Sequence, residues 1–373
     1  MGRARGTAEV VSRSASRDAV SRFSRVAMRG EPVDVSVLTP VLNEEAHIRA
    51  AAATMLAQRF DGSIEFLFIH GRSQDRTLEI LRELQRADPR VRILENPRQS
   101  TPVALNIGLA EARGEYVARM DAHTLYPEGY LAHGVARLRR GDVAHVSGPQ
   151  VAQGDGPWSR RVALALDTRL GTGGAKFRHA TETGIEVDSG FTGVWPRSVL
   201  EAHRGWDEEW DNDQDSELAA RIRGRGGRIL CLPEMEARYI PRDSLPGLVR
   251  QYWRYGVFRA KTAGAHPESM RRSHLLAPSL ALSLAASVLP LRGLRRIARA
   301  ALGLWFTAVA GVTAAVGCRK ARNVKTARPA DIAALPAVFG AMHLAWGFGF
   351  LAGCVRFGPP LRALAHIARR RSR

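Results

Sequence analysis

Two residues that can both bind a metal ion, Asp121 and His123, come just after the predicted strand at residues 116–120. Side chains at positions i and i+2 that leave a strand end for a loop can converge on one cation. A carboxylate and an imidazole suit Mn²⁺ or Mg²⁺ when phosphate oxygens complete the coordination. An Asp-x-His triplet alone is common by chance, but its place at the end of a predicted strand favours a divalent-metal site.

Four acidic residues lie within seven positions at the start of a predicted helix: Asp211, Asp213, Asp215 and Glu217. Acidic side chains near a helix N-terminus complement the helix dipole, so capping explains part of this cluster. Four acids exceed what capping requires. A carboxylate held there can instead act as the general base toward a hydroxyl nucleophile, and both interpretations stay open from the residues alone.

The segment QYWRYG at residues 251–256 combines an arginine with aromatic rings about one helical turn apart. Such a group can anchor a helix at a membrane interface. It can equally bind a diphosphate through the arginine and stack on a sugar ring. Composition does not separate the two interpretations.

Polar loops also follow two other predicted strands. In TPVLNEE at residues 39–45, Pro40 is expected to end strand pairing and Asn43 to cap the next helix. In HGRSQDRT at residues 70–77, a turn again precedes a capped helix. If the strands are parallel neighbours, the second loop faces the same crevice as Glu44.

Short apolar segments alternate with amphipathic ones through this part of the chain. The predicted strands are residues 35–39, 64–69, 91–94, 116–120 and 143–146, and the predicted helices are residues 44–58, 76–87, 101–112 and 128–140. This β-α-β-α order predicts an α/β fold with a mostly parallel sheet flanked by helices. Sheets of this kind bind ligands beyond the carboxyl ends of their strands, where the polar residues above lie.

The formal net charge of +19 is not spread evenly along the 373 residues. Residues 1–30 hold seven arginines against two acids, and residues 271–373 hold 17 basic residues against Asp331 alone. The remaining 31 basic and 33 acidic residues leave the middle almost neutral. A nearly neutral middle disfavours nucleic-acid binding, and residues 1–32 are expected to form a disordered basic tail.

Three uncharged apolar runs occupy the C-terminal part, at about residues 275–291, 300–318 and 332–355. The last two are long enough to cross a hydrocarbon core of about 30 Å, which predicts two or three membrane helices. Because every gap between the runs is basic, the first run is expected to be re-entrant or interfacial. We therefore expect a catalytic domain at residues 33–270 that stays soluble when residues 271–373 are removed.

Cys231, Cys318 and Cys354 are far apart and show no spacing typical of a metal site or a disulfide framework. This pattern suits a reducing environment that faces the cytosol.

Over residues 33–256 the chain resembles the family-2 inverting glycosyltransferases of the GT-A fold, in particular the succinoglycan-type exopolysaccharide glucosyltransferases. The motifs that carry the resemblance are VSVLTPVLNEE at 35–45, GRSQDRT at 71–77, NPRQSTPVALNIGLAEARGEY at 96–116, MDAHTLYP at 120–127, DSGFTGVWPR at 188–197, DQDSELAARIRGRGG at 213–227 and QYWRYG at 251–256. Their order and spacing are specific together, although no single motif is.

The resemblance assigns roles to individual residues. Asp215 is the expected general base, with Asp213 and Gln214 as secondary candidates. Asp121 and His123 take the metal-binding position, with His in place of the family's second Asp. The nucleotide-sugar pocket comprises Pro40, Asn43, Glu44, His70, Asn106 and Asp121, and the acceptor and diphosphate site comprises Gln251, Arg254 and Tyr255. His70 and Gln214 depart from the acids usual at their positions.

The resemblance implies a membrane-associated, Mg²⁺- or Mn²⁺-dependent hexosyltransferase. Its expected donor is a UDP-sugar, with glucose foremost, and its expected acceptor a polyprenyl-diphosphate-linked saccharide. The catalytic domain would face the cytoplasm at the inner membrane, near anionic lipids. Two alternatives remain: a transferase that charges polyprenyl phosphate with one sugar, and an inactive membrane scaffold of a polysaccharide assembly complex.

Overall fold

The computed structural model describes residues 32–173, 184–190, 192–318 and 328–369. The chain forms two compact units, each made of several segments. Unit 1 comprises Met1–Gly148, Phe191–Glu208 and Gly227–Glu236, and unit 2 comprises Pro149–Gly190, Glu209–Gly226 and Ala237–Arg373. The helices that follow residue 208 thus belong with the C-terminal segment, whereas the sequence suggested a division at residue 270. Almost all of the predicted basic tail lies outside the described residues.

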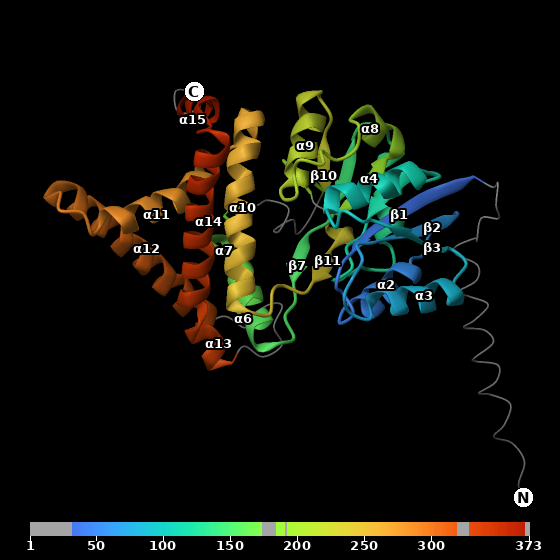
Figure 1. Cartoon of the computed structure of the whole chain (residues 1–373), viewed down its shortest axis with the longest axis horizontal. Helices are drawn as coiled ribbons and strands as arrows, with labels where there is room; N and C mark the ends of the chain where they lie inside the picture. The colour runs from blue at the N-terminus through green and yellow to red at the C-terminus, as the bar shows by residue number, and fades with distance from the viewer. Residues whose placement is uncertain (1–31, 174–183, 191, 319–327, 370–373) are drawn as a thin grey trace, which may run out of the picture. The chain divides into compact units, whose positions relative to one another are not determined.

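Unit 1 contains a mixed sheet that is mostly parallel (Figure 1). Its strands are β1 (Val33–Val41), β2 (Ile64–His70), β3 (Val91–Glu95), β4 (Gly114–Arg119), β6 (His145–Ser147), β9 (Gly193–Pro196) and β10 (Ile229–Cys231). They lie in the order β3-β2-β1-β4-β9-β6-β10. Strand β9 pairs antiparallel with β4 and β6, whereas β1 with β2, β1 with β4, β2 with β3 and β6 with β10 pair in parallel. The predicted α/β fold is confirmed, and β9 is an antiparallel strand that the sequence did not predict.

Helices cover both faces of the parallel strands because β1 and β2 are apolar on both sides. A Cβ added at Gly108 would lie 2.9 Å from Leu38 Cδ2 and 3.0 Å from Ile69 Cδ1, so α4 (Thr101–Glu111) packs on that face. Thr39, one residue along β1, donates to Met55 Sδ of α2 (Ile48–Leu56) at 3.7 Å. Since neighbouring strand residues point to opposite faces, α2 and α4 lie on opposite sides of the sheet.

The remaining helices of unit 1 are α3 (Thr77–Ala87), α5 (Tyr130–Leu138) and α8 (Arg197–Ala202). The four helices predicted up to residue 140 are all present. Two local predictions are wrong. Pro40 does not end β1, because it lies in register with Ile69 and the strand continues to Val41. Asn43 does not cap α2, whose N-cap is His47 without a side-chain hydrogen bond.

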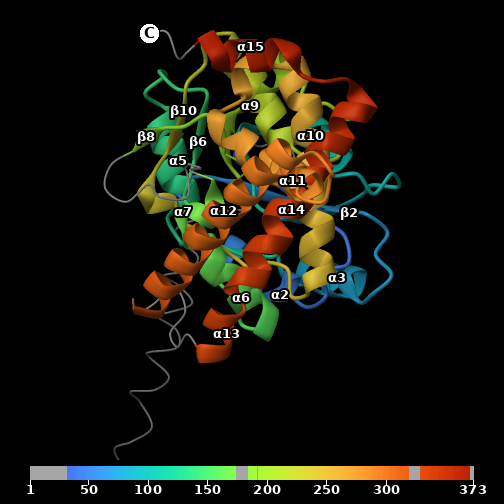
Figure 2. The same cartoon turned by 90° about the vertical axis from the view of Figure 1, so that its left-hand side faces the viewer.

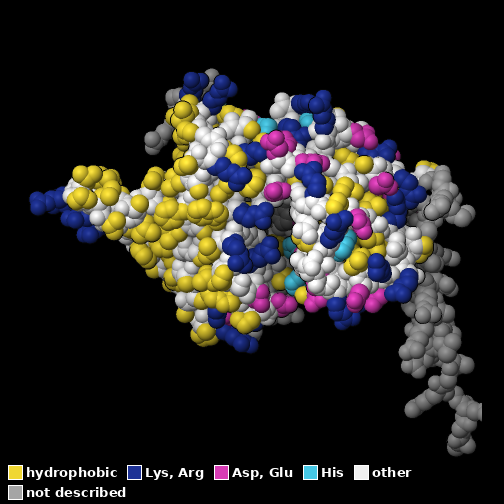
Figure 3. Space-filling view, in the orientation of Figure 1, with side chains coloured by type: hydrophobic (Ala, Val, Ile, Leu, Met, Phe, Trp, Pro, Cys, Tyr) yellow, Lys and Arg dark blue, Asp and Glu magenta, His cyan; other side chains and the backbone are white. Residues whose placement is uncertain are grey.

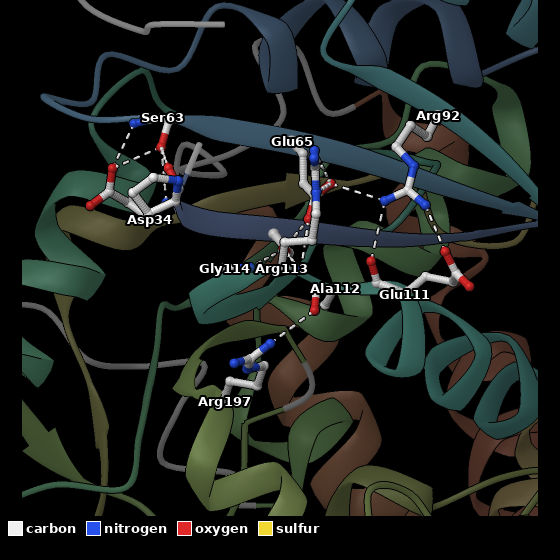
Figure 4. A network of polar contacts seen from close by, with 11 residues as sticks. Asp34, Ser63, Glu65, Arg92, Glu111, Ala112, Arg113, Gly114 and Arg197 are labelled. Atoms are coloured by element: carbon white, nitrogen blue, oxygen red, sulfur yellow. Dashed lines mark hydrogen bonds and ion pairs between the residues drawn. The ribbon is translucent and has the colours of Figure 1, made fainter. Parts of the chain in front are cut away.

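A polar network joins the amino-terminal ends of the strands (Figure 4). The buried carboxylate of Glu65 accepts from Ser36 Oγ at 2.6 Å and from the Arg113 backbone N–H at 2.8 Å. The guanidinium groups of Arg113 and Arg92 lie 2.8 and 3.1 Å from its Oε2. Burial raises the pKa of Glu65, but the hydrogen bonds from Ser36 and Arg113 outweigh it, so the pKa falls below its usual value. This network ties β1, β2 and β3 to the start of β4.

Unit 2 is mainly helical. Its longer helices are α6 (Pro157–Leu166), α9 (Gln214–Gly224), α10 (Leu245–Ala265), α11 (Leu276–Ala286), α12 (Arg292–Cys318), α14 (Leu335–Phe357) and α15 (Leu361–Arg369). Its shorter described elements are α7 (Arg169–Thr172), α13 (Pro329–Ala333), the 3-10 turns η3 (Pro267–Ser269) and η4 (Arg272–Leu275), and the strands β7 (Gln150–Ala152), β8 (Ile185–Glu186) and β11 (Ala237–Tyr239). One apolar core joins α6, Leu248 of α10 and the first half of α14.

The helices α10 and α14 lie side by side in both views (Figures 1 and 2). Glycines allow the close approach. A Cβ at Gly349 would lie 2.3 Å from the Trp253 carbonyl oxygen, and one at Gly353 would lie 2.5 Å from that of Val257. A Cβ at Gly256 of α10 would lie 2.1 Å from the Trp346 carbonyl oxygen. Small residues four apart let two helix backbones touch in this way.

Two segments of the described chain are long and apolar enough to cross a membrane, Arg292–Cys318 and Pro329–Phe357. Only 6% of the most apolar window of the first segment is buried, so most of this helix lies outside the core of unit 2. The run predicted at residues 275–291 forms the 11-residue α11, which at about 1.5 Å per residue is too short to cross.

Candidate active site

The loops that follow β1 and β2 are joined by hydrogen bonds. The backbone N–H of Asn43 donates to Ser73 Oγ at 2.9 Å, and the N–H of Gln74 donates to Asn43 Oδ1 at 2.8 Å. The N–H of Glu44 donates to Thr77 Oγ1 at 2.8 Å. Asn43 has a φ of 54°, which turns the chain sharply after β1. The two loops therefore form one polar surface at the carboxyl ends of their strands.

His70 ends β2 and is 4% exposed. Its Nε2 accepts from the backbone N–H of Ser73 at 3.0 Å, which assigns the ring proton to Nδ1. Burial lowers the pKa of His70, so the ring is neutral near pH 7. Any hydrogen bond from this ring to a bound base would have to come from Nδ1.

Asp121 lies just beyond β4 and is held by Arg119. Arg119 Nε is 2.8 Å from Asp121 Oδ1, and Arg119 Nη2 is 3.3 Å from Oδ2. Both side chains are largely buried. The backbone N–H of Asp121 donates to the hydroxyl of the buried Tyr126 at 2.6 Å. These contacts fix both the backbone and the carboxylate of Asp121.

His123, the second residue of the predicted metal pair, contacts Glu44. His123 Nδ1 lies 3.0 Å from Glu44 Oε1. Metal-binding histidines commonly give one ring nitrogen to a carboxylate and the other to the ion, so this contact would assign Nε2 to a metal. The described residues contain no group of three or more His, Cys, Asp or Glu side chains that could hold a metal ion. Asp121 and His123 nevertheless suit an ion whose coordination is completed by phosphate oxygens.

Asn106 projects from α4 toward the segment after α8. Its Nδ2 donates to the Trp206 carbonyl at 2.8 Å, and its Oδ1 accepts from the Trp206 N–H at 2.9 Å. Asn106 Nδ2 also lies 3.2 Å from Glu208 Oε1. A contact between Asn106 and a nucleotide sugar would have to compete with these bonds.

In unit 2, the acids at the start of α9 differ in their partners. Asp213 Oδ1 lies 2.7 Å from Arg259 Nη2 of α10. Glu217, 2% exposed, accepts two hydrogen bonds of 2.7 Å from Arg221 and lies 3.3 Å from His266 Nε2. Asp215 is half-buried in the first turn of α9, and Gln214 beside it is buried. Two of the acids thus pair with specific cations.

The predicted diphosphate motif lies on α10 and spans almost two of its turns. Gln251 Nε2 donates to Tyr255 Oη at 2.9 Å, and the rings of Tyr252 and Tyr255 meet edge to face at 5.5 Å. Arg254 is exposed. Gly256, the last residue of the motif, is buried against α14.

Sequence reasoning missed two arginines that hold candidate residues. Arg119 precedes Asp121 by two positions, and side chains two apart on a strand share a face, so the strand period could have revealed it. Arg259 contacts Asp213 from 46 residues away, and no local signal predicts that pair.

The chain is similar in sequence to known proteins. The sequence model of the family described as Glycosyl transferase family 2 matches residues 36–204. The chain is 30% identical over 318 residues to the succinoglycan biosynthesis protein ExoA of Rhizobium meliloti (strain 1021), covering 84% of this chain and 93% of that protein. A Methanococcus voltae dolichyl N-acetyl-alpha-D-glucosaminyl phosphate 3-beta-D-2,3-diacetamido-2,3-dideoxy-beta-D-glucuronosyltransferase is 23% identical over 60% of this chain and 72% of its own length.

A solved structure shares the fold. It is the mannosyltransferase PcManGT from Pyrobaculum calidifontis in complex with GDP-Man and Mn²⁺, with a TM-score of 0.53, 19% identity, and coverage of 93% of this chain and 94% of that one. The fold is therefore the GT-A fold of nucleotide-sugar transferases. The 30% identity to ExoA extends over most of the length of both proteins, and the family model matches residues 36–204. The chain therefore belongs to glycosyltransferase family 2.

Proposed function

We propose that the protein is a membrane-associated inverting hexosyltransferase of exopolysaccharide or cell-surface glycan synthesis. Its donor would be a UDP-hexose, with glucose foremost, and its acceptor a polyprenyl-diphosphate-linked saccharide at the cytoplasmic face of the inner membrane. The name of the ExoA relative supports the polysaccharide role, and the name of the Methanococcus relative supports a lipid-linked acceptor. The observation that carries the proposal is the fixed pair Asp121 and His123 at the carboxyl edge of a family-2 sheet.

On the donor side, Asp121 and His123 would hold a divalent metal together with the diphosphate oxygens. PcManGT was solved with Mn²⁺ and a nucleotide sugar, which supports that chemistry. When bound, the ion would stabilise the negative charge of the leaving diphosphate. Asn43 and Glu44 would line the nucleotide pocket, with Pro40 and His70 beneath them, and Asn106 would support that pocket through the Trp206 segment.

On the acceptor side, Asp215 would remove the proton from the attacking hydroxyl group. The position of Asp215 in the motif at residues 213–227, which resembles the family's base motif, supports this choice. The hydroxyl oxygen would attack the anomeric carbon as the bond to the diphosphate breaks, with inversion at that carbon. Arg254 would bind the diphosphate, and Gln251 would orient Tyr255 beside it.

The deciding experiment combines a transfer assay with a base variant. Membranes containing the full chain, labelled UDP-glucose, Mn²⁺ and a polyprenyl-diphosphate-linked saccharide should yield an extended lipid-linked product. Asp215→Asn should lower the transfer rate roughly 10²–10⁴-fold, because the hydroxyl loses its base, and leave UDP binding nearly unchanged. Asp211→Asn, at an exposed acid of the same segment, serves as the matched control. Turnover retained in Asp215→Asn would remove Asp215 from the role of base.

The transfer assay and a calorimetric measurement separate the alternatives. A product that carries one sugar on polyprenyl monophosphate would favour the monoglycosyltransferase. Absence of Mn²⁺-dependent UDP binding in calorimetry would favour the inactive scaffold, which the departures at His70 and Gln214 motivate.

A further inference from the structure

The helix α10 accompanies α14 from its first turn to its last. Leu248, near the start of α10, shares a core with Leu335 and Phe339 at the start of α14. Further along, a Cβ at Gly353 of α14 would meet the Val257 carbonyl of α10 at 2.5 Å. At the end, the ring centroids of Phe258 and Phe357 are 6.4 Å apart. Residue numbers rise together in both helices, so they run parallel and occupy the same depth in any membrane.

The helix α10 is too charged for the hydrocarbon core. It carries four cations in 21 residues: Arg250, Arg254, Arg259 and Lys261. Arg259 pairs with Asp213, and Lys261 contacts Glu209 and the ring of Trp210. If α14 crossed the bilayer, α10 would cross beside it, and its charged side chains would enter the hydrocarbon core. Each charge at that depth has a large free-energy cost.

Both ends of α14 are also fixed to polar parts of unit 2. At its start, the buried Asp331 of α13 lies 3.3 Å from Arg160 and 3.1 Å from Arg161, both on α6. At its end, Ala363 and Ile367 of α15 pack against α10. Since α11 is too short to cross, α12 and α14 must either both cross or both remain on one side.

An apolar surface nevertheless covers the side of these helices that faces away from α10 (Figure 3). Its most exposed members are Leu276 and Leu282 of α11, Val288 and Leu291 in the connection, Ile297, Leu304 and Phe306 of α12, Val355 of α14 and Leu361 of α15. Val355 is 89% exposed and Val288 is 81% exposed. Exposed arginines accompany this surface at positions 292, 296, 299, 356 and 362. Apolar side chains mixed with arginines match a leaflet of anionic phospholipid.

We propose that α11, α12, α14 and α15 dock on one leaflet of an anionic bilayer, with α14 lying along the membrane surface and not crossing it. The inference rests on the proposed membrane association and is independent of the sugar transferred. With α14 along the membrane surface, α10, which carries Arg254, lies at the level of the headgroups. A lipid-borne diphosphate would then reach the motif without leaving the membrane.

Cysteine labelling tests the topology in the full chain. In a background of Cys318→Ala and Cys354→Ala, with Cys231 left buried, Ala333→Cys and Arg362→Cys place exposed thiols at the two ends of α14. Glu79→Cys on α3 marks the side of unit 1. A membrane-impermeant maleimide should label all three in inside-out vesicles and none in intact spheroplasts. Labelling of Ala333→Cys from the side opposite to Glu79→Cys would overturn the proposal, and recovery of the protein in the supernatant would overturn the membrane association itself.

A charge placed on the apolar surface tests the docking face. Val355→Asp should weaken binding to phosphatidylcholine vesicles containing phosphatidylglycerol roughly tenfold or more, because it removes apolar contact and repels the anionic headgroups. Ala110→Asp, at an exposed position of α4, should bind like the parent protein. Equal binding by Val355→Asp and the parent would show that this face of α14 does not meet the lipid.

Discussion

At the scale of single residues, the partner of a carboxylate decides which chemistry that carboxylate can perform. Burial raises the pKa of Glu217, but hydrogen bonds with His266 and Arg221 outweigh it, so the pKa falls below its usual value. A buried carboxylate of this kind stabilises the first turn of α9 and is a poor proton acceptor. Asp121 likewise has a structural partner, since Arg119 Nε lies 2.8 Å from its Oδ1. The acidic residues singled out in the sequence therefore differ in role according to their partners.

Arg119 is the residue whose replacement tests that view. Arg119→Met should lower transfer activity roughly 10–100-fold, because the carboxylate of Asp121 loses the group that orients it. Arg119→Lys should recover only part of the activity, since an ammonium cannot form the side-on contact. The rate at saturating UDP-sugar and Mn²⁺ is the measurement.

Arg137→Met is the matched control for that experiment. It breaks another arginine–aspartate pair of unit 1, with Asp142, that involves none of the candidate residues. A similar loss of activity in both variants would mean that Arg119 acts only through stability.

Part of the candidate site could be predicted from sequence because it depends on neighbouring residues. The strand end before Asp121 and the helix start before Asp215 are local patterns, and the structure contains both. The contact between His123 and Glu44 joins residues 79 positions apart. Similarly, Asn106 and Trp206 are 100 positions apart. Such contacts follow from how the elements pack, which residue spacing does not encode.

At the scale of elements, the contact between α10 and α14 depends on glycine. Gly349→Ala should lower the free energy of unfolding of unit 2 by roughly 1–3 kcal/mol, because its methyl group would overlap the Trp253 carbonyl and separate the helices. Gly340→Ala on the same helix is the control, since its Cβ would meet only Trp305 Cη2 at 3.8 Å. That control should be neutral or stabilised by up to about 1 kcal/mol through helix propensity. Denaturant unfolding followed by tryptophan fluorescence measures both, and equal stabilities would contradict the tight contact.

The Glu65 network gives unit 1 a defined pH dependence. The folded pKa of Glu65 is lowered, so its stabilisation is fully present above the unfolded pKa of about 4.3 and is lost as the pH falls through the folded value. Glu65→Gln should cost roughly 1.5–3 kcal/mol at neutral pH and much less in acid. Hydrogen exchange of the β2 amides in both proteins, from neutral pH to about pH 3, measures the difference after correction for intrinsic rates. A difference that stays constant with pH would contradict the assignment to Glu65.

Most elements up to residue 146 could be predicted because each strand and helix has its own periodicity. Strand β9 could not, since its four residues lie between two parallel strands that are far away in sequence. The predicted start of α2, at Glu44, is four residues before the actual start at Ile48. The backbone of the loop before α2 donates hydrogen bonds to side chains of residues 73–77. These tertiary contacts override the helix propensity of the loop.

At the scale of the whole molecule, the C-terminal helices are part of the folded core of unit 2. Leu335, Val338 and Phe339 of α14 share a core with α6 and Leu248. Removing residues 271–373 would expose that core, so we expect the truncated chain to aggregate and lose activity. This replaces the expectation from sequence that residues 33–270 form an independent soluble domain.

A chain that ends at Phe357 is the control, because it loses α15 and keeps α14 against α10. It should remain folded and active, with weaker binding to anionic vesicles. Size-exclusion chromatography, circular dichroism and vesicle flotation measure these properties. A monomeric, active protein truncated after residue 270 would contradict the expectation.

The glycine contacts between α10 and α14 have a thermodynamic consequence. Where Gly256, Gly349 and Gly353 bring the two backbones together, no side-chain layer can absorb a movement of one helix relative to the other. A lipid leaflet on α14 and a diphosphate on Arg254 would then act on the same rigid pair. Any factor by which vesicles tighten binding of the diphosphate must equal the factor by which the diphosphate tightens binding to vesicles. The membrane would thus be an allosteric ligand of the enzyme as well as the place where it works.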